Sequence, residues 1–163
     1  AAMIAATEIR AGVSEVVIVG GMESMTNAPH IARNVAKGQD VPFGSLESVL
    51  MGDGLKDAFT GESMGNTGET VAEEHGISRE ESDKFAVRSH SLADEAWQKG
   101  WISEEVFPVG SLTMDEGIRP ETNEETLSSL RTVFSVDGQV TAGNASQVSD
   151  GASAVLILSL IHI

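Results

Sequence analysis

Two short apolar runs near opposite ends of the chain constrain the fold most. The first, residues 16–19 (Val-Val-Ile-Val), is β-branched, is closed by Gly20-Gly21, and follows an apolar segment over 1–11 that repeats at helical spacing. The second, residues 152–158, is far shorter than the roughly 20 apolar residues that span a bilayer. Continuous apolar runs are typical of strands covered on both faces. A helix ending at Gly12 followed by buried strands predicts a layered α/β core.

The middle of the chain changes character. Residues 22–65 show no sustained period, which predicts loops apart from a short helix near 46–51. A short helix is expected over 67–74, stopping at His75-Gly76. Ser78 and Glu81 form a capping box that opens a longer helix reaching Gly100. Its predicted buried face consists of residues at helical spacing, namely Phe85, Ser89, Leu92, Ala93, Ala96 and Trp97.

The last third returns to β character. Thr122 and Glu125 repeat the capping-box pattern and predict another helix. Asp137-Gly138 is a turn signal, and 139–141 reads as a short strand before a polar loop. The sequence therefore predicts β-rich ends that enclose a helical insert.

Charge and cysteine content exclude several functions. The 163 residues carry a formal net charge of −15, from 25 acidic residues against 10 Lys and Arg. Nucleic acid is an unfavourable partner for such a chain, because binding requires a basic patch. The absence of cysteine excludes disulfides, thiolate metal sites and a cysteine nucleophile within these residues.

Four stretches of the chain stand out as motifs. They are Gly20-Gly21-Met22-Glu23-Ser24-Met25-Thr26-Asn27-Ala28-Pro29; Asp53-Gly54-Leu55-Lys56-Asp57-Ala58-Phe59 with Met64-Gly65; residues 76–81 with Asp83, Phe85, Ala86 and Ser89; and Asp137-Gly138, residues 140–146 and Asp150-Gly151-Ala152. In this order they resemble the thiolase family (acetyl-CoA C-acetyltransferases and 3-ketoacyl-CoA thiolases). They cover nearly the whole chain, so chance is a poor explanation.

The resemblance implies a thiolase-like layered αβαβα fold, here incomplete, with a helical loop-domain insert. Residues 1–27 would belong to the N-terminal α/β core, 28–136 to the loop domain, and 137–159 to the return into the core. The final residues, 160–163, follow the last strand without a turn or cap and are expected to be an artefactual tail. Because Ala1 lies inside an apolar segment with no initiating Met, we expect an internal fragment of the family's later N-terminal half.

The resemblance also implies the chemistry. Family members condense or thiolytically cleave acyl-CoA units such as acetoacetyl-CoA and 3-ketoacyl-CoA through a Cys thioester, with a His and a second Cys assisting. All three positions fall outside this chain, so no catalytic residue is expected within it. Coenzyme A thioesters would be substrates, and neither cofactor nor metal is expected.

Six residues match family positions that contact coenzyme A. Ser146 and Ala142 would lie along the pantetheine arm, because a small side chain permits close approach and a hydroxyl can bond an amide. Arg119 would pair with phosphate. Leu130 and Phe134 would flank the adenine, and Met64 would face the ligand. The alternatives are core packing for the apolar three, a surface arginine for Arg119, and an ordinary turn or N-glycosylation triplet for 144–146.

Other polar residues have simpler interpretations. Glu62-Ser63 stands where many relatives have an aromatic residue and His before Met-Gly, so acyl preference is open. Glu73-Glu74 and Glu80-Glu81 are interpreted as solvated helix faces. The four histidines lack metal-ligand spacing and are interpreted as surface or cap residues: His30, His75, His90 and His162.

Three classes of function remain open from the sequence. The first is a cytoplasmic acyltransferase whose intact parent is a homodimer or homotetramer and has no nucleic-acid or membrane partner. The second is a non-catalytic thiolase-like protein that binds acyl-CoA or lipid, and the third is a structural or interaction module that does not bind coenzyme A. A nucleophilic Cys preceding the 1–11 helix in the complete reading frame would separate the first from the second, since fold alone does not decide function.

Overall fold

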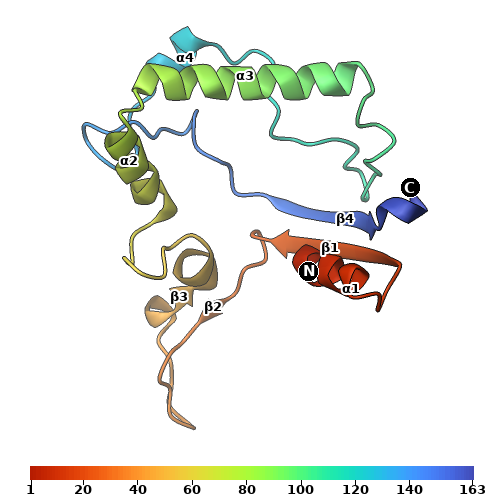
Figure 1. The fold of residues 1–163 in the computed structure, drawn as a ribbon. Helices are drawn as coiled ribbons and strands as arrows, with labels where there is room; N and C mark the ends of the chain where they lie inside the picture. Colours follow the sequence, from red (N-terminus) through yellow and green to blue (C-terminus); the bar gives the residue numbers. More distant parts are fainter. The chain divides into compact units, whose positions relative to one another are not determined.

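The computed structural model describes all residues 1–163, which divide into two compact units: residues 1–50 with 148–163 (unit 1), and residues 51–147 (unit 2). In chain order (Figure 1) the elements are α1 (Ala2–Arg10), β1 (Val16–Ser24), β2 (His30–Ile31), the 3-10 helix η1 (Phe43–Ser45), β3 (Glu47–Ser48), the π-helix η2 (Leu50–Gly54), α2 (Met64–His75), α3 (Arg79–Gln98), α4 (Glu124–Ser128), β4 (Asp150–Leu158) and the 3-10 helix η3 (Leu160–His162).

The terminal strands pair with each other in unit 1. β1 and β4 are antiparallel, in register from Val16 opposite Leu158 to Ser24 opposite Asp150, and lie side by side in Figure 1. α1 packs against both strands and buries Ala5. The helix and both strands predicted from the sequence are confirmed. β1 continues through Gly20, where a Cβ would lie 3.0 Å from the carbonyl oxygen of Ser153 on β4.

The prediction that these strands are covered on both faces is wrong for this chain. Ile18 is 76% exposed and Val155 is 57% exposed. The reason is that the sheet contains only β1 and β4, and α1 is the helix that packs on it. Unit 1 therefore presents apolar strand surface to solvent.

The loop-rich stretch contains one further misprediction. The helix expected near 46–51 is instead β3, which pairs with β2 through Glu47 opposite Ile31 and Ser48 opposite His30, followed by η2. The backbone N–H of Val49 donates to the carbonyl of Pro29 at 3.0 Å, which extends this pairing. Contact with a distant segment overrides a weak local helical preference.

The end of α2 and the start of α3 lie at their predicted signals, whereas α2 begins at Met64, three residues before the predicted start at 67. The Ser63 side chain accepts from the Asn66 N–H at the start of α2, which ends at Gly76 with φ +64°. At α3, Ser78 and Glu81 make both halves of the capping box. Local capping chemistry thus defines the helix boundaries.

Two later predictions in unit 2 are corrected. The N-cap of α4 is Asn123 rather than Thr122, since its side-chain oxygen accepts from the Thr126 N–H at 2.9 Å. Residues 139–141 form no strand, apart from one bridge between Thr132 and Thr141. The N–H of Val140 donates to the Glu69 carboxylate at 2.9 Å, so it is not available to a strand partner.

The predicted buried face of α3 is only partly buried. Phe85 is 68% exposed and Leu92 is 46% exposed, whereas the acidic Asp83 is 3% exposed. No helix in the structure combines the length and the apolar character that crossing a membrane requires. The predicted domain limits at residues 27, 136 and 159 concern the family's domains and stay a prediction.

Candidate functional site

Unit 2 contains a cavity of about 730 Å³ formed by one face of α3 and two loops. The first loop is 115–119 and the second is 142–147. Its lining residues are Phe85, Ala86, Ser89, His90, Ala93, Asp115, Gly117, Ile118, Arg119, Ala142, Gly143, Asn144, Ala145, Ser146 and Gln147. The cavity explains the exposure of Phe85, because that ring faces open space instead of a packed neighbour.

His90 holds the first loop against α3. Its ring Nδ1 accepts from the backbone N–H of Arg119 at 3.2 Å. This hydrogen bond requires an unprotonated Nδ1, which is the neutral form of the ring with its proton on Nε2. His90, which the sequence suggested was a surface or cap residue, therefore has a defined contact at the cavity.

The two loops meet at Gly117. A Cβ built there would lie 1.8 Å from the side-chain nitrogen of Gln147, so the Gln147 amide occupies the space that any larger residue would need. Glycine at this position permits the close approach of the two loops. This contact joins the two loops that line the cavity.

The entry to the second loop is anchored by Glu69 of α2. Its carboxylate accepts from the backbone N–H groups of Gln139 at 2.6 Å and Val140 at 2.9 Å. A Cβ at Gly138 would lie 2.2 Å from a Glu69 carboxylate oxygen. The Asp137-Gly138 turn is thus packed directly on an ionised side chain.

Asn144 is a structural residue of the second loop. Its amide nitrogen donates to Asp83 and to the Gln139 carbonyl, both at 2.9 Å. Both amide hydrogens are therefore in use. This argues against the N-glycosylation interpretation of residues 144–146, which requires a free amide.

Three of the six predicted site residues line the same cavity: Arg119, Ala142 and Ser146. Arg119 is exposed, and its guanidinium makes no hydrogen bond or ion pair within the chain. The Ser146 hydroxyl makes one long contact, 3.4 Å to the Gln147 carbonyl. A free cation on the first loop and a nearly free hydroxyl on the second thus line the same cavity, together with the small side chain of Ala142.

The other three predicted residues do not line this cavity. Phe134 packs on the start of α2, where a Cβ at Gly65 would lie 2.2 Å from its ring. Met64 precedes that glycine and is 41% exposed. Leu130 packs on Gly143, where a Cβ would lie 2.7 Å from its Cδ1. These contacts are packing contacts between elements of unit 2.

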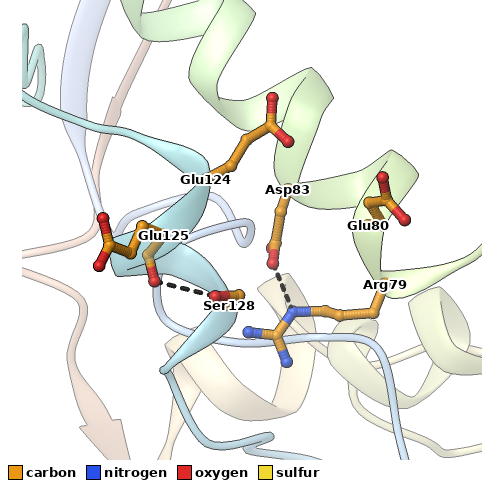
Figure 2. Close-up of a pocket in the computed structure, with 6 residues that line it drawn as sticks. All are labelled: Arg79, Glu80, Asp83, Glu124, Glu125 and Ser128. Carbon is orange, nitrogen blue, oxygen red and sulfur yellow. Dashed lines mark hydrogen bonds and ion pairs between the residues drawn. The ribbon is translucent and has the colours of Figure 1, made fainter.

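A second cavity of unit 2, of about 530 Å³, lies between α3 and α4 (Figure 2). Its lining residues are Arg79, Glu80, Asp83, Glu124, Glu125 and Ser128. Only Asp83 points toward the Arg79 guanidinium, whereas the carboxylates of Glu80, Glu124 and Glu125 point away from it (Figure 2). The acidic side chains do not converge on one point, and no three His, Asp or Glu residues gather to hold a metal ion anywhere in the structure.

Sequence reasoning assigned no supporting role to Glu69, Asp83 or Asn144, although Asp83 and Asn144 lie within the motif stretches. The spacing of Arg79 and Asp83 was a usable signal, because residues four apart face each other on a helix. Asn144 and Glu69 gave no such signal, since their partners lie 61 and 70 residues away. The glutamate pairs behave as expected, with Glu80 bonded to Lys84 at the surface.

Comparison with known sequences gives one consistent result. The family model described as "Thiolase, N-terminal domain" matches residues 1–160. The chain is 41% identical over 168 aligned positions to a "Probable acetyl-CoA acyltransferase" of Staphylococcus epidermidis, covering 98% of this chain. It spans 43% of the length of that curated relative.

Solved structures agree with the sequence matches. The chain is 39% identical to human mitochondrial 3-ketoacyl-CoA thiolase, solved in complex with CoA, with a TM-score of 0.86 over 99% of this chain and 42% of that one. It is 35% identical to the Bacillus anthracis acetyl-CoA acetyltransferase, with a TM-score of 0.85 over 99% of this chain and 43% of that one. These likenesses confirm the α/β fold class predicted from the sequence.

Proposed function

Because the chain belongs to the thiolase family, as its motifs predict, we propose that it forms the coenzyme A-binding part of an acyltransferase acting on acyl-CoA units. The reaction is the condensation or thiolytic cleavage of acetoacetyl-CoA or 3-ketoacyl-CoA. The observation that carries the proposal is the cavity of about 730 Å³ lined by Arg119, Ala142 and Ser146. These three residues were selected from the sequence for contact with coenzyme A.

Arg119 suits the phosphate end of the ligand. A guanidinium offers paired donors that match phosphate oxygens. Its own side chain has no internal partner, while its backbone is fixed by His90. In a chain with a net charge of −15, a polyanionic ligand needs a placed cation of this kind.

The opposite loop suits the pantetheine arm. Ala142 leaves room for a thin chain to approach the backbone, and the Ser146 hydroxyl can donate to or accept from one of its amides. Leu130, Phe134 and Met64 remain predicted contacts of the adenine and the ligand, supported by their motif positions and not by the cavity.

We assign the bond-making chemistry to residues outside these 163. The chain contains no cysteine, so the thioester with the acyl group cannot form on it. In this proposal a nucleophilic Cys, an activating His and a second Cys come from other parts of the complete protein. Homo-oligomeric assembly and a cytoplasmic location are further expectations for that protein.

Binding of coenzyme A to the protein expressed from the complete reading frame tests the proposal. Calorimetry should give a measurable Kd, and Arg119→Gln should weaken it by about tenfold or more, the size expected for a charge-assisted hydrogen bond. Arg88→Gln is the matched control, since Arg88 is an exposed arginine of α3 that does not line the cavity. Equal loss in both variants, or no binding at all, would refute the proposal.

The alternative is a non-catalytic protein that binds acyl-CoA or lipid. It shares the cavity, so binding alone does not separate the two. Assay of acetoacetyl-CoA thiolysis with the complete protein does, together with the presence of the nucleophilic Cys in its reading frame. Binding without turnover would favour the alternative.

A further inference from the structure

A buried carboxylate links α3 to the loop that lines the cavity. Asp83 is 3% exposed. One of its oxygens accepts from the Arg79 Nε at 2.8 Å, and the other accepts from the Asn144 amide nitrogen at 2.9 Å. Asp83 itself is not among the residues that line the proposed coenzyme A cavity.

Arg79 is itself fixed from both sides. Besides Asp83, its guanidinium donates to the carbonyls of Leu127 at 2.6 Å and Leu130 at 3.0 Å, near the end of α4. The acceptor position of Asp83 is therefore set by α3 and α4 together. A buried ion pair is weak evidence for stability, because desolvation offsets much of its attraction. The ion pair fixes the position of the Asp83 oxygen that accepts from the Asn144 amide.

Asn144 connects the Asp83 carboxylate to the backbone of the loop. Its side-chain oxygen accepts from the Thr141 N–H at 2.8 Å, and its nitrogen also donates to the Gln139 carbonyl. The turn is closed by the Ala145 N–H, which donates to the Thr141 carbonyl at 3.1 Å. Ala142 lies inside this turn, and Ser146 directly follows it.

We infer that Asp83 is a positioning residue for ligand binding, holding Asn144 so that the 141–145 turn presents Ala142 and Ser146 to the cavity. The inference rests on the proposed function for the identity of the ligand. Without Asp83, the Asn144 amide loses a carboxylate acceptor, and the partly buried Arg79 guanidinium loses its ion-pair partner and keeps only its bonds to the Leu127 and Leu130 carbonyls. The turn then has one fewer link to α3.

The test uses Asp83→Ala, Asn144→Ala and the double variant in the protein from the complete reading frame. Two quantities are measured: hydrogen exchange of the Thr141 and Ala145 amides without ligand, and the Kd for coenzyme A. We expect about tenfold faster exchange and about tenfold weaker binding in each single variant, as for the loss of a hydrogen bond to a charged group. The double variant should exchange no faster, and bind coenzyme A no more weakly, than the single variant with the larger effect. The reason is that both residues act through one hydrogen bond.

Two further variants keep the result interpretable. Asp94→Ala removes another α3 aspartate, one bonded to Gln98 and absent from the cavity, and should change neither quantity. Asp83→Asn keeps the side-chain volume if the alanine variant fails to fold, and its single carbonyl oxygen can serve Arg79 or Asn144 but not both. Its exchange and Kd should lie between those of wild type and Asp83→Ala.

The outcomes separate the inference from the proposed function. Unchanged exchange at Thr141 and Ala145 in a folded Asp83 variant overturns the inference, whatever coenzyme A does. Faster exchange with an unchanged Kd also overturns it, because the turn would then not control binding. Absence of coenzyme A binding by the wild-type protein overturns the proposed function, and with it the ligand-binding role of Asp83.

Discussion

The two units of the chain are organised by different interactions. Unit 1 depends on a backbone ladder of nine paired residues in each strand, and it leaves apolar side chains such as Ile18 and Val155 exposed. Unit 2 depends on side chains that reach distant backbone, as Glu69 and Arg79 do. The comparison indicates that unit 2 specifies its own site geometry, while unit 1 specifies a strand pairing that α1 covers only in part.

The largest expected effect is on the association of unit 1. Exposed apolar strand surface favours contact between copies, so the 163-residue chain should associate in a concentration-dependent way. Ile18→Lys places a charge on that surface and should shift the chain toward monomer in size-exclusion chromatography with light scattering. Val35→Lys, a similar change outside the sheet, should have little effect. A compact wild-type monomer at all concentrations would contradict this expectation.

The second effect tests packing in unit 2. Gly143→Ala places a Cβ 2.4 Å from the Leu127 Cδ2, and Leu127 is only 4% exposed, so it has little room to move. Overpacking of this kind should lower the free energy of unfolding by about 1–3 kcal/mol. Thermal denaturation measures the change. Gly52→Ala is the control, since its Cβ would meet nothing within 4 Å, and an equal loss in both variants would exclude the packing explanation.

A smaller effect is expected at the start of α3. Ser78→Ala removes the side chain that accepts from the Glu81 N–H, and should cost about 1 kcal/mol of unfolding free energy. Ser82→Ala, one turn later, removes a hydroxyl that donates only to a helix carbonyl and should cost less. Denaturant titration measures the unfolding free energy of both variants. An equal loss in the two would mean that the capping role of Ser78 is not the cause.

These local signals explain which parts of the fold were predictable. The end of α2 at Gly76 and the start of α3 at the Ser78–Glu81 box were predicted, because each signal lies within a few residues of the helix it defines. The start of α2 and the N-cap of α4 were predicted a few residues away from where they lie, whereas two other failures have distant causes. The expected helix near 46–51 pairs with β2, and in the expected strand at 139–141 the Gln139 and Val140 N–H groups donate to Glu69.

Of the six predicted site residues, Arg119, Ala142 and Ser146 line one cavity, and their contact with coenzyme A stays a prediction. The supporting residues were not identified, because a buried acid such as Asp83 resembles any helical aspartate until its partners are known. Sequence periodicity placed Phe85 in a core because it reports a face and not what covers that face.

The smallest expected effect is a pH dependence of Tm that arises in unit 1. In unit 1, backbone N–H donation from Thr26 lowers the pKa of Asp150 below its ordinary value, with the Thr26 and Ser24 hydroxyls assisting. A lowered folded-state pKa gives stability that is present above the ordinary value and is lost as pH falls through the folded one. Wild type and Asp150→Asn should therefore differ in Tm at pH 7, and the difference should shrink as pH falls below 3.8, the ordinary value of this carboxyl, and through its lowered folded-state pKa. Asp40→Asn, at an exposed carboxylate of unit 1 to which no hydrogen bond is donated, is the control and should show no such convergence. A Tm difference for Asp150→Asn that persists unchanged at low pH would mean that the carboxylate acts by shape and not by charge. In that case packing would hold the loop after β1. Unit 1 would then lack the charged side chain-to-backbone hydrogen bonds that organise unit 2.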